Sequence, residues 1–156
     1  MINSIHHVAI STGDMKRSLK FYRDLLGLEV VMEGGWAAGD AESQMAEKIN
    51  ALKAPAAKMV MLKTGNAMIE IFEYSSPQPK PGDPNRPVCD HGITHICLDV
   101  TDLDAEYDRL KTAGMTFHCP PQMLGRSVKT TYGRDPDGNV VELQEILWEG
   151  SRLALG

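Results

Sequence analysis

The pattern of apolar and polar positions occurs twice along the chain. The first copy begins at Ile5 and reads IHHVAISTGDMKRSLKFYRDLLGLEV; the second begins at Ile93 and reads ITHICLDVTDLDAEYDRLKTAGMTF. Each starts with the alternation typical of a strand, passes through a turn with an acidic residue, and continues with apolar residues at helical spacing. Gly27 and Gly114 then mark the predicted helix ends before another strand. The pattern predicts two copies of one folding unit.

The helix faces and closing strands also correspond. Residues expected on one helix face are Leu19, Tyr22 and Leu26 in the first copy, and Leu103, Tyr107 and Leu110 in the second. The strand-like runs NAMIEIFEY and GNVVELQEI follow the turn sequences KTGN and DPDGN, which are typical of hairpins. This alignment matches His7 with His95 and Glu70 with Glu142.

The first copy contains an insertion. The interval from His7 to Glu70 is 63 residues (70 − 7), whereas that from His95 to Glu142 is 47 (142 − 95), so about 16 residues are extra. We place them at about 36–55, where Met45, Ile49 and Leu52 fall at helical spacing and Asp40 or Ser43 could cap the helix. A helix that covers the sheet is the favoured interpretation; a lid or pocket wall is the alternative.

A proline-rich stretch separates the two copies. Residues 77–92 contain Pro77, Pro79, Pro81, Pro84 and Pro87, a composition typical of a stiff, extended linker. The predicted organisation is therefore a first module at 1–76, the linker at 77–92, a second module at 93–148 and a C-terminal tail at 149–156.

Strand alternation groups the four matched polar residues. Apolar neighbours of Glu70 and Glu142 point to the opposite face, where the helices are expected, and His6 is expected on the opposite face from His7. The two histidines and two glutamates are thus predicted on the uncovered faces of two equivalent sheets. Buried carboxylates need compensation, and imidazole with carboxylate suits a divalent zinc, nickel, cobalt, iron or manganese ion. Unrelated polar residues on solvent-facing strands are the alternative, which leaves the match between the copies unexplained.

Composition narrows the function classes. The chain has 156 residues, is 42% hydrophobic and 24% charged, and carries a net charge of −5, so no nucleic-acid partner is predicted. No apolar run approaches the roughly 20 residues of a membrane span, and the first residues do not resemble a signal peptide. Three widely spaced cysteines fit no disulfide framework. We expect a cytoplasmic protein without membrane contact.

Several stretches together resemble the vicinal oxygen chelate superfamily, which includes glyoxalase I, methylmalonyl-CoA epimerase, extradiol dioxygenases and bleomycin-resistance proteins. They are HHVAI, SLKFYRDLLGLEV, MIEIFEY, GITHICLDV and RDPDGNVVELQE. The resemblance implies an α+β fold of two βαβββ modules whose eight strands form an incomplete barrel around one divalent metal ion. It also implies that the ion is held by His7, Glu70, His95 and Glu142. Glutamate at position 70 is similar to glyoxalase I, whereas the extradiol dioxygenases have a histidine there.

The same resemblance implies a chemistry. Glyoxalase I-like and epimerase-like enzymes chelate two neighbouring oxygens of a small carbonyl or carboxylate substrate and move an α-proton through an enediolate. We therefore expect a metal-dependent isomerase or lyase, with Glu142 slightly ahead of Glu70 as the base. The alternatives are an Fe(II) extradiol-type dioxygenase and a non-catalytic protein that binds a small molecule.

The sequence also offers candidates for substrate contacts and for assembly. Arg126 and Lys129 could bind a carboxylate or phosphate at the pocket mouth, although a solvated hairpin surface is the favoured interpretation for each. Tyr132 could donate a hydrogen bond within the site or serve only in packing. Two small modules with open sheet edges favour a homodimer.

Overall fold

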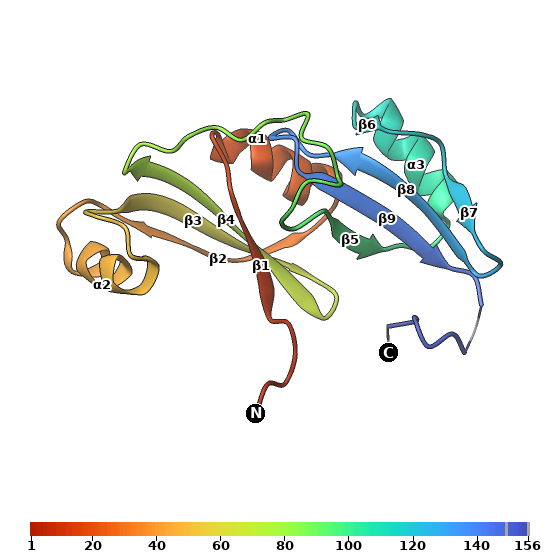
Figure 1. Ribbon diagram of the computed structural model, residues 1–156, viewed down its shortest axis with the longest axis horizontal. Coiled ribbons are helices and arrows are strands. Elements are labelled where there is room, and N and C mark those ends of the chain that lie inside the picture. The colour runs from red at the N-terminus through yellow and green to blue at the C-terminus, as the bar shows by residue number, and fades with distance from the viewer. Residues whose placement is uncertain (149, 156) are drawn as a thin grey trace. The chain divides into compact units, whose positions relative to one another are not determined.

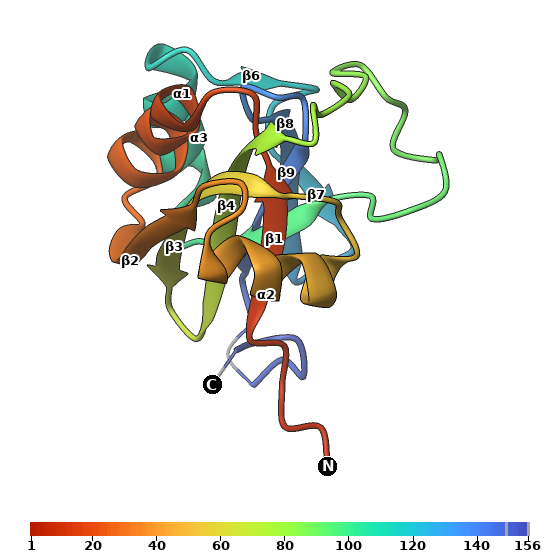
Figure 2. The same cartoon turned by 90° about the vertical axis from the view of Figure 1, so that its left-hand side faces the viewer.

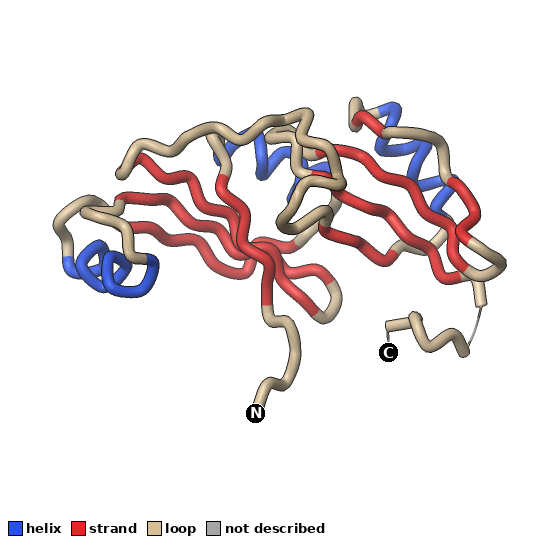
Figure 3. Tube along the Cα trace, in the orientation of Figure 1, coloured by secondary structure: helices blue, strands red, loops and turns tan. Residues whose placement is uncertain are grey.

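The computed structural model describes residues 1–148 and 150–155, and its contacts divide the chain into two compact units (Figure 1). The first unit is Met1–Pro81 and the second is Gly82–Gly156. The division falls inside the predicted linker of residues 77–92. Strands make up most of the regular structure in each unit (Figure 3). None of the helices described is long and apolar enough to cross a membrane.

The first unit is a βαβββ module with one inserted helix. Its order is β1 (His7–Ser11), α1 (Met15–Leu19), the π-helical η1 (Lys20–Leu25), β2 (Glu29–Trp36), α2 (Ala41–Asn50), β3 (Ala56–Thr64) and β4 (Ala67–Ser76). The sheet order is β1-β4-β3-β2, with β1 and β4 parallel and the other pairs antiparallel. The inserted helix is α2, which begins after Asp40, whose carboxylate accepts a hydrogen bond from the Ser43 N–H at 2.6 Å.

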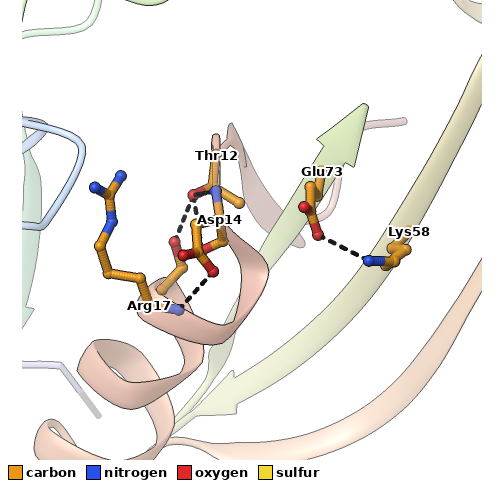
Figure 4. A network of polar contacts seen from close by, with 6 residues as sticks. Thr12, Asp14, Arg17, Lys58 and Glu73 are labelled. Atoms are coloured by element: carbon orange, nitrogen blue, oxygen red, sulfur yellow. Dashed lines mark hydrogen bonds and ion pairs between the residues drawn. The ribbon is translucent and has the colours of Figure 1, made fainter. Parts of the chain in front are cut away.

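Local hydrogen bonds place α1 directly after β1 (Figure 4). The Asp14 carboxylate accepts from the Arg17 N–H at 3.1 Å, which caps the helix. The buried hydroxyls of Thr12 and Ser18 lie 2.6 Å apart and tie the strand end to the helix. On the sheet, Lys58 of β3 forms a 3.3 Å ion pair with Glu73, its directly paired residue on β4.

The buried face of the first helix differs from the predicted one. Tyr22 is fully buried as expected, but Leu19 and Leu26 are half-buried, and the other buried positions of this helical segment are Met15, Ser18 and Phe21. The π-helical turns of η1 are wider than α-helical turns, so the apolar face moves away from regular spacing. The glycine after this helix, Gly27, has φ 78° and ends the helix as predicted.

The second unit repeats the plan without the insertion. Its order is β5 (Ile96–Asp99), α3 (Leu103–Thr112), β6 (Thr116–Phe117), β7 (Gln122–Leu124), β8 (Val128–Arg134) and β9 (Val140–Ile146). The sheet order is β5-β9-β8-β6, and β7 also pairs with β8. Both β6 and β7 pair with β8, at opposite ends of that strand, so they form one edge strand interrupted near Pro120 and Pro121. This break gives nine described strands where eight were predicted.

The second helix has the predicted face. Leu103, Tyr107 and Leu110 of α3 are buried, and Gly114 follows the helix with φ 100°. The Glu145 carboxylate on β9 accepts hydrogen bonds from the N–H groups of Asp102 and Leu103, at 2.8 and 3.1 Å. The helix start is therefore fixed to one face of its sheet.

Part of the predicted linker packs against the second unit. A guanidinium nitrogen of Arg134 donates to the Arg86 carbonyl at 3.0 Å, and Arg86 in turn donates to the Ile93 carbonyl at 2.6 Å. Gly138 lies so close to Pro84 that an added Cβ would be 2.3 Å from the proline Cα. Pro84 and Arg86 of the predicted linker are thus held on the β8–β9 hairpin.

The α+β prediction with two βαβββ modules is confirmed. In each closing strand the apolar neighbours of the glutamate are buried: Ile69 and Ile71 on β4, and Val141 and Leu143 on β9. Alternation then directs Glu70 and Glu142 to the other faces of their sheets. The closure of the two sheets into a barrel around a metal stays a prediction.

Candidate metal centre

One His–Glu pair lies within the first unit. His7 is the first residue of β1, and Glu70 lies on the parallel neighbour β4. The Nε2 atom of His7 is 3.4 Å from Oε2 of Glu70, with side chains 38% and 15% exposed. Parallel pairing of the first and last strands of the module brings together two residues 63 positions apart in the sequence (70 − 7).

An equivalent pair lies within the second unit. His95 precedes β5, and Glu142 lies on the parallel neighbour β9, paired with Cys97. The Nε2 atom of His95 is 2.9 Å from Oε2 of Glu142, and here the side chains are 28% and 10% exposed. The repeat seen in the sequence is therefore a repeat of paired imidazole and carboxylate groups.

Each histidine is contacted at its other nitrogen by the residue before it. Nδ1 of His7 lies 2.9 Å from Nδ1 of His6, and Nδ1 of His95 lies 2.8 Å from the Thr94 hydroxyl. These contacts orient Nε2 of each ring toward its glutamate, which is how histidines that ligate metals are usually held.

The expectation that His6 points away from His7 is wrong. The two rings meet edge to face, with centroids 5.2 Å apart. The strand begins only at His7, so strand alternation does not extend back to His6. His6 is therefore a positioning residue for His7.

The two glutamates differ in how firmly they are held. The Thr130 hydroxyl donates to Oε1 of Glu142 at 2.5 Å, whereas the cross-strand neighbours of Glu70 are the apolar residues Ala9 and Met61. Burial, together with the charge and hydrogen bonding of the adjacent Glu142 carboxylate, raises the pKa of the Cys97 thiol to about 12. The carboxylate of Glu142 is thus surrounded by donors.

The pairs fit the chemistry of a divalent metal. Ligand atoms about 2.1 Å from one ion are about 3.0–3.4 Å apart at angles of roughly 90–110°. The two N···O distances, 2.9 and 3.4 Å, are of that size. Within either unit taken alone, the described residues contain no group of three or more metal-binding side chains. Each unit supplies one imidazole nitrogen and one carboxylate.

Tyr132 lies beside the second pair. It is paired directly with Glu142 across β8 and β9, and its ring centroid is 5.0 Å from that of His95. Burial raises the pKa of the Tyr132 hydroxyl, and the charge of Glu142 raises it further. The phenol therefore stays protonated and can donate a hydrogen bond on the same face as Glu142.

The structure does not bring the two predicted cationic residues to this pair. Lys129 is three positions from Tyr132 and so faces the other side of the sheet, where it forms an ion pair with Asp104 of α3. Arg126 lies in the turn before Val128, and Val128 is four residues, about 13 Å, along β8 from Tyr132. A lysine fixed on the helix side and an arginine at the hairpin tip are not candidates for contacts with this half of the site.

Sequence reasoning missed three polar neighbours of the second pair: Thr94, Cys97 and Thr130. Alternation could have found Thr130, because it is two positions from Tyr132 and shares its face. Alternation also puts Cys97 on the face of His95, but its pairing with Glu142 depends on the register of β5 and β9.

Comparisons with known proteins place these features in one family. The Glyoxalase/Bleomycin resistance protein/Dioxygenase superfamily matches residues 4–143. The ethylmalonyl-CoA/methylmalonyl-CoA epimerase of Cereibacter sphaeroides is 28% identical over 94% of this chain and 100% of its own length. A 2-epi-5-epi-valiolone epimerase from Actinomyces is 29% identical over 69% of this chain, which spans only 57% of that relative. A glyoxalase family protein from Bacillus cereus shares the fold, with a TM-score of 0.83 at 20% identity over 95% of this chain and 97% of its own.

Proposed function

Because the chain belongs to the Glyoxalase/Bleomycin resistance protein/Dioxygenase superfamily, we propose that it is a metal-dependent isomerase or lyase for a small carbonyl or carboxylate compound. The observation that carries the proposal is the pair of equivalent His–Glu contacts, one in each unit, at 3.4 and 2.9 Å. The similarity to epimerases over most of the chain supports the reaction class.

The proposed ligands are His7, Glu70, His95 and Glu142. A divalent ion bound there would act as a Lewis acid on two neighbouring substrate oxygens and stabilise the charge left by loss of an α-proton. Tyr132, with its pKa raised, would donate a hydrogen bond to a substrate oxygen on the Glu142 side. His6 and Thr94 would keep the two imidazoles in the orientation that presents Nε2.

The hydrogen bonds suggest different tasks for the two glutamates. A base must have an accessible carboxylate lone pair and freedom to move, whereas a ligand is best held in place. Glu142 is held by Thr130 and accepts from Cys97, while the cross-strand neighbours of Glu70 are apolar. We therefore assign Glu142 as the anchored ligand and Glu70 as the group that takes and returns the proton. This reverses the slight preference for Glu142 drawn from the sequence.

Metal content is the first test. Protein purified without added metal, then loaded with zinc, nickel, cobalt, manganese or iron, should hold about one ion per site by elemental analysis. His7→Ala and His95→Ala should each reduce that content severalfold, because each removes one of four ligands. His91→Ala is the matched control, since His91 is an exposed loop residue outside both pairs. Unchanged metal content in both ligand variants would refute the shared site.

Proton exchange is the second test. A panel of 2-oxo acids, 2-hydroxy ketones and acyl thioesters is incubated with the metal-loaded protein in D₂O, and deuterium at the α-carbon is followed by NMR. Metal-dependent exchange, lost in His95→Ala but kept in His91→Ala, is the expected result. Oxygen uptake without α-proton exchange would instead identify a dioxygenase.

A further inference from the structure

An apolar pocket of ≈ 440 Å³ lies in the first unit between α2 and the sheet. Figure 2 looks onto α2 and shows it in front of the strands of that sheet. Strand residues in the lining are Trp36, Phe72 and Tyr74, and α2 contributes Met45, Ala46 and Ile49. Met45 and Ile49 are 63% and 79% exposed, so the apolar stripe predicted on this helix forms the pocket rim instead of core. The insertion is a pocket wall rather than a simple cover.

The strand side of the pocket is aromatic. The rings of Trp36 and Phe72 have centroids 6.0 Å apart, and those of Phe72 and Tyr74 are stacked at 5.5 Å. The Trp36 indole nitrogen is buried and has no hydrogen-bond partner among the described residues.

The pocket adjoins the candidate metal ligand of its own sheet. Glu70, Phe72 and Tyr74 alternate along β4 and share one face, so Phe72 begins about 6.7 Å from Glu70. The charge of Glu70 reaches Tyr74, since it contributes to raising the pKa of that hydroxyl. A compound whose oxygens lie at Glu70, with a ring joined two or three bonds further along, would extend toward Phe72.

The second unit lacks the aromatic positions. The residues two and four positions beyond Glu142 are Gln144 and Ile146, where the first unit has Phe72 and Tyr74 after Glu70. Among the described residues of the second unit there is also no counterpart of the inserted helix. The aromatic strand residues and α2 therefore occur together, on one half of the repeat, as expected if they serve one binding task.

We infer that this pocket binds the uncharged aromatic ring of a substrate whose two neighbouring oxygens are held beside Glu70. The inference rests on the proposed function for the oxygens, but the ring pocket stands on its own geometry. A cavity of about 150 Å³ holds benzene, so a pocket of ≈ 440 Å³ accommodates a phenyl or naphthyl group with its linker. Glu42 in the lining and Glu70 nearby disfavour a negatively charged ring.

Three probe compounds distinguish binding of the aromatic ring from binding of the two neighbouring oxygens. Phenylpyruvate carries both, pyruvate carries only the oxygens, and benzyl alcohol carries the ring without a neighbouring oxygen pair. Binding is followed by the fluorescence of Trp36 in a Trp148→Phe background, because the chain has two tryptophans. We expect phenylpyruvate to bind at least tenfold more tightly than pyruvate to the metal-loaded protein, and benzyl alcohol to quench Trp36 with or without metal.

Substitution of the exposed rim residue Ile49 tests whether the ring binds in the pocket. Ile49→Glu adds a carboxylate at the pocket mouth without disturbing the core, and should remove most of the advantage of phenylpyruvate while leaving pyruvate binding unchanged. Gln44→Glu adds the same charge on α2 outside the lining and should have no effect.

Two results have opposite meanings. Equal binding of phenylpyruvate and pyruvate, or an advantage that survives Ile49→Glu, would overturn the inference. A ring preference sensitive to Ile49→Glu, combined with pyruvate binding that does not weaken on metal removal or in His95→Ala, would support the pocket and count against the proposed function alone.

Discussion

The Thr130 hydroxyl donates a 2.5 Å hydrogen bond to Oε1 of Glu142 on the adjacent strand, while Oε2 of the same carboxylate faces His95 at 2.9 Å. One oxygen is therefore fixed by a neighbour, and the other is presented to the imidazole. Outer partners of metal ligands typically contribute 10–100-fold to metal affinity. Thr130 is a positioning residue for Glu142.

Thr130→Val should weaken metal binding by about 10–100-fold with little loss of fold, since valine keeps the shape but not the hydroxyl. Competition with a chromogenic chelator measures the affinity, and circular dichroism checks the fold. Thr130→Ser retains the donor and should stay close to the parent protein. Equal affinity in the valine and serine variants would show that this hydrogen bond does not orient a ligand.

Replacing each of the two glutamates by glutamine should have different effects on metal content and on proton exchange. Glu70→Gln should keep much of the metal and lose about 10²–10⁴-fold in α-proton exchange, because it removes the proposed base but leaves an amide oxygen. Glu142→Gln should chiefly lower metal content, because its carboxylate is the anchored one. Glu73→Gln, on the opposite face of β4, is the control for both. Full exchange by Glu70→Gln with exchange lost in metal-loaded Glu142→Gln would return the base to Glu142.

Much of the fold followed from local patterns. Alternation placed Ile69, Ile71, Val141 and Leu143 in the core, and helical spacing placed Leu110 correctly. The same spacing misplaced Leu19 and Leu26, because a π-helical segment has no signature in apolar periodicity. Counting alternate positions along the strand from Tyr132 would also have placed Lys129 on the face of the sheet that the helix covers.

The remaining features depend on contacts distant in sequence. The hydrogen bond between Thr130 and Glu142 needs the register of β8 and β9, and the exposure of Met45 and Ile49 depends on where α2 meets the sheet. Residues 77–92 were predicted as a stiff, extended linker, because prolines alone do not reveal the close packing of Pro84 on Gly138.

Gly138 should tolerate no side chain. It has φ 88°, and an added Cβ would lie 2.3 Å from Cα of Pro84, so Gly138→Ala should lower the free energy of unfolding by about 2–4 kcal/mol. Gly65→Ala is the matched control, because Gly65 also has positive φ (51°) in a hairpin turn but open space around it, and it should cost only about 1–2 kcal/mol. Urea unfolding measures both. Equal losses would mean that residues 82–92 do not pack tightly on the hairpin.

Exposed edge strands support the proposed homodimer. Met32 on β2 and Leu124 on β7 are 49% and 66% exposed, and each strand is at an edge of its sheet. Light scattering should give about 34 kDa, twice the 17.1 kDa of one chain. Met32→Lys or Leu124→Lys should shift the mass toward the monomer. A wild-type chain that stays at the monomer mass up to high micromolar concentration would exclude the homodimer.

Ionisation of the Tyr74 hydroxyl provides a test of the contact between α2 and β4 at the pocket. Burial raises the pKa of its hydroxyl above the ordinary 10.0, a hydrogen bond with the Asn50 side chain lowers it in part, and the charge of Glu70 raises it. Since Asn50 is the last residue of α2, its interaction with Tyr74 links the helix to β4. Absorbance at alkaline pH should show Tyr74 ionising above pH 10, with Tyr74→Phe identifying the transition.

Asn50→Ala should raise the pKa of Tyr74 further, because the phenolate loses a donor. The stability effect has a definite sign: a hydroxyl whose pKa is higher in the folded chain contributes fully below pH 10 and loses that contribution as the pH rises through the folded value. Unfolding free energy should therefore fall with pH above 10 more steeply in the parent than in Tyr74→Phe. An unchanged pKa of Tyr74 in Asn50→Ala would mean that the contact between α2 and β4 does not persist in solution. In that case α2 would not form a wall of the pocket.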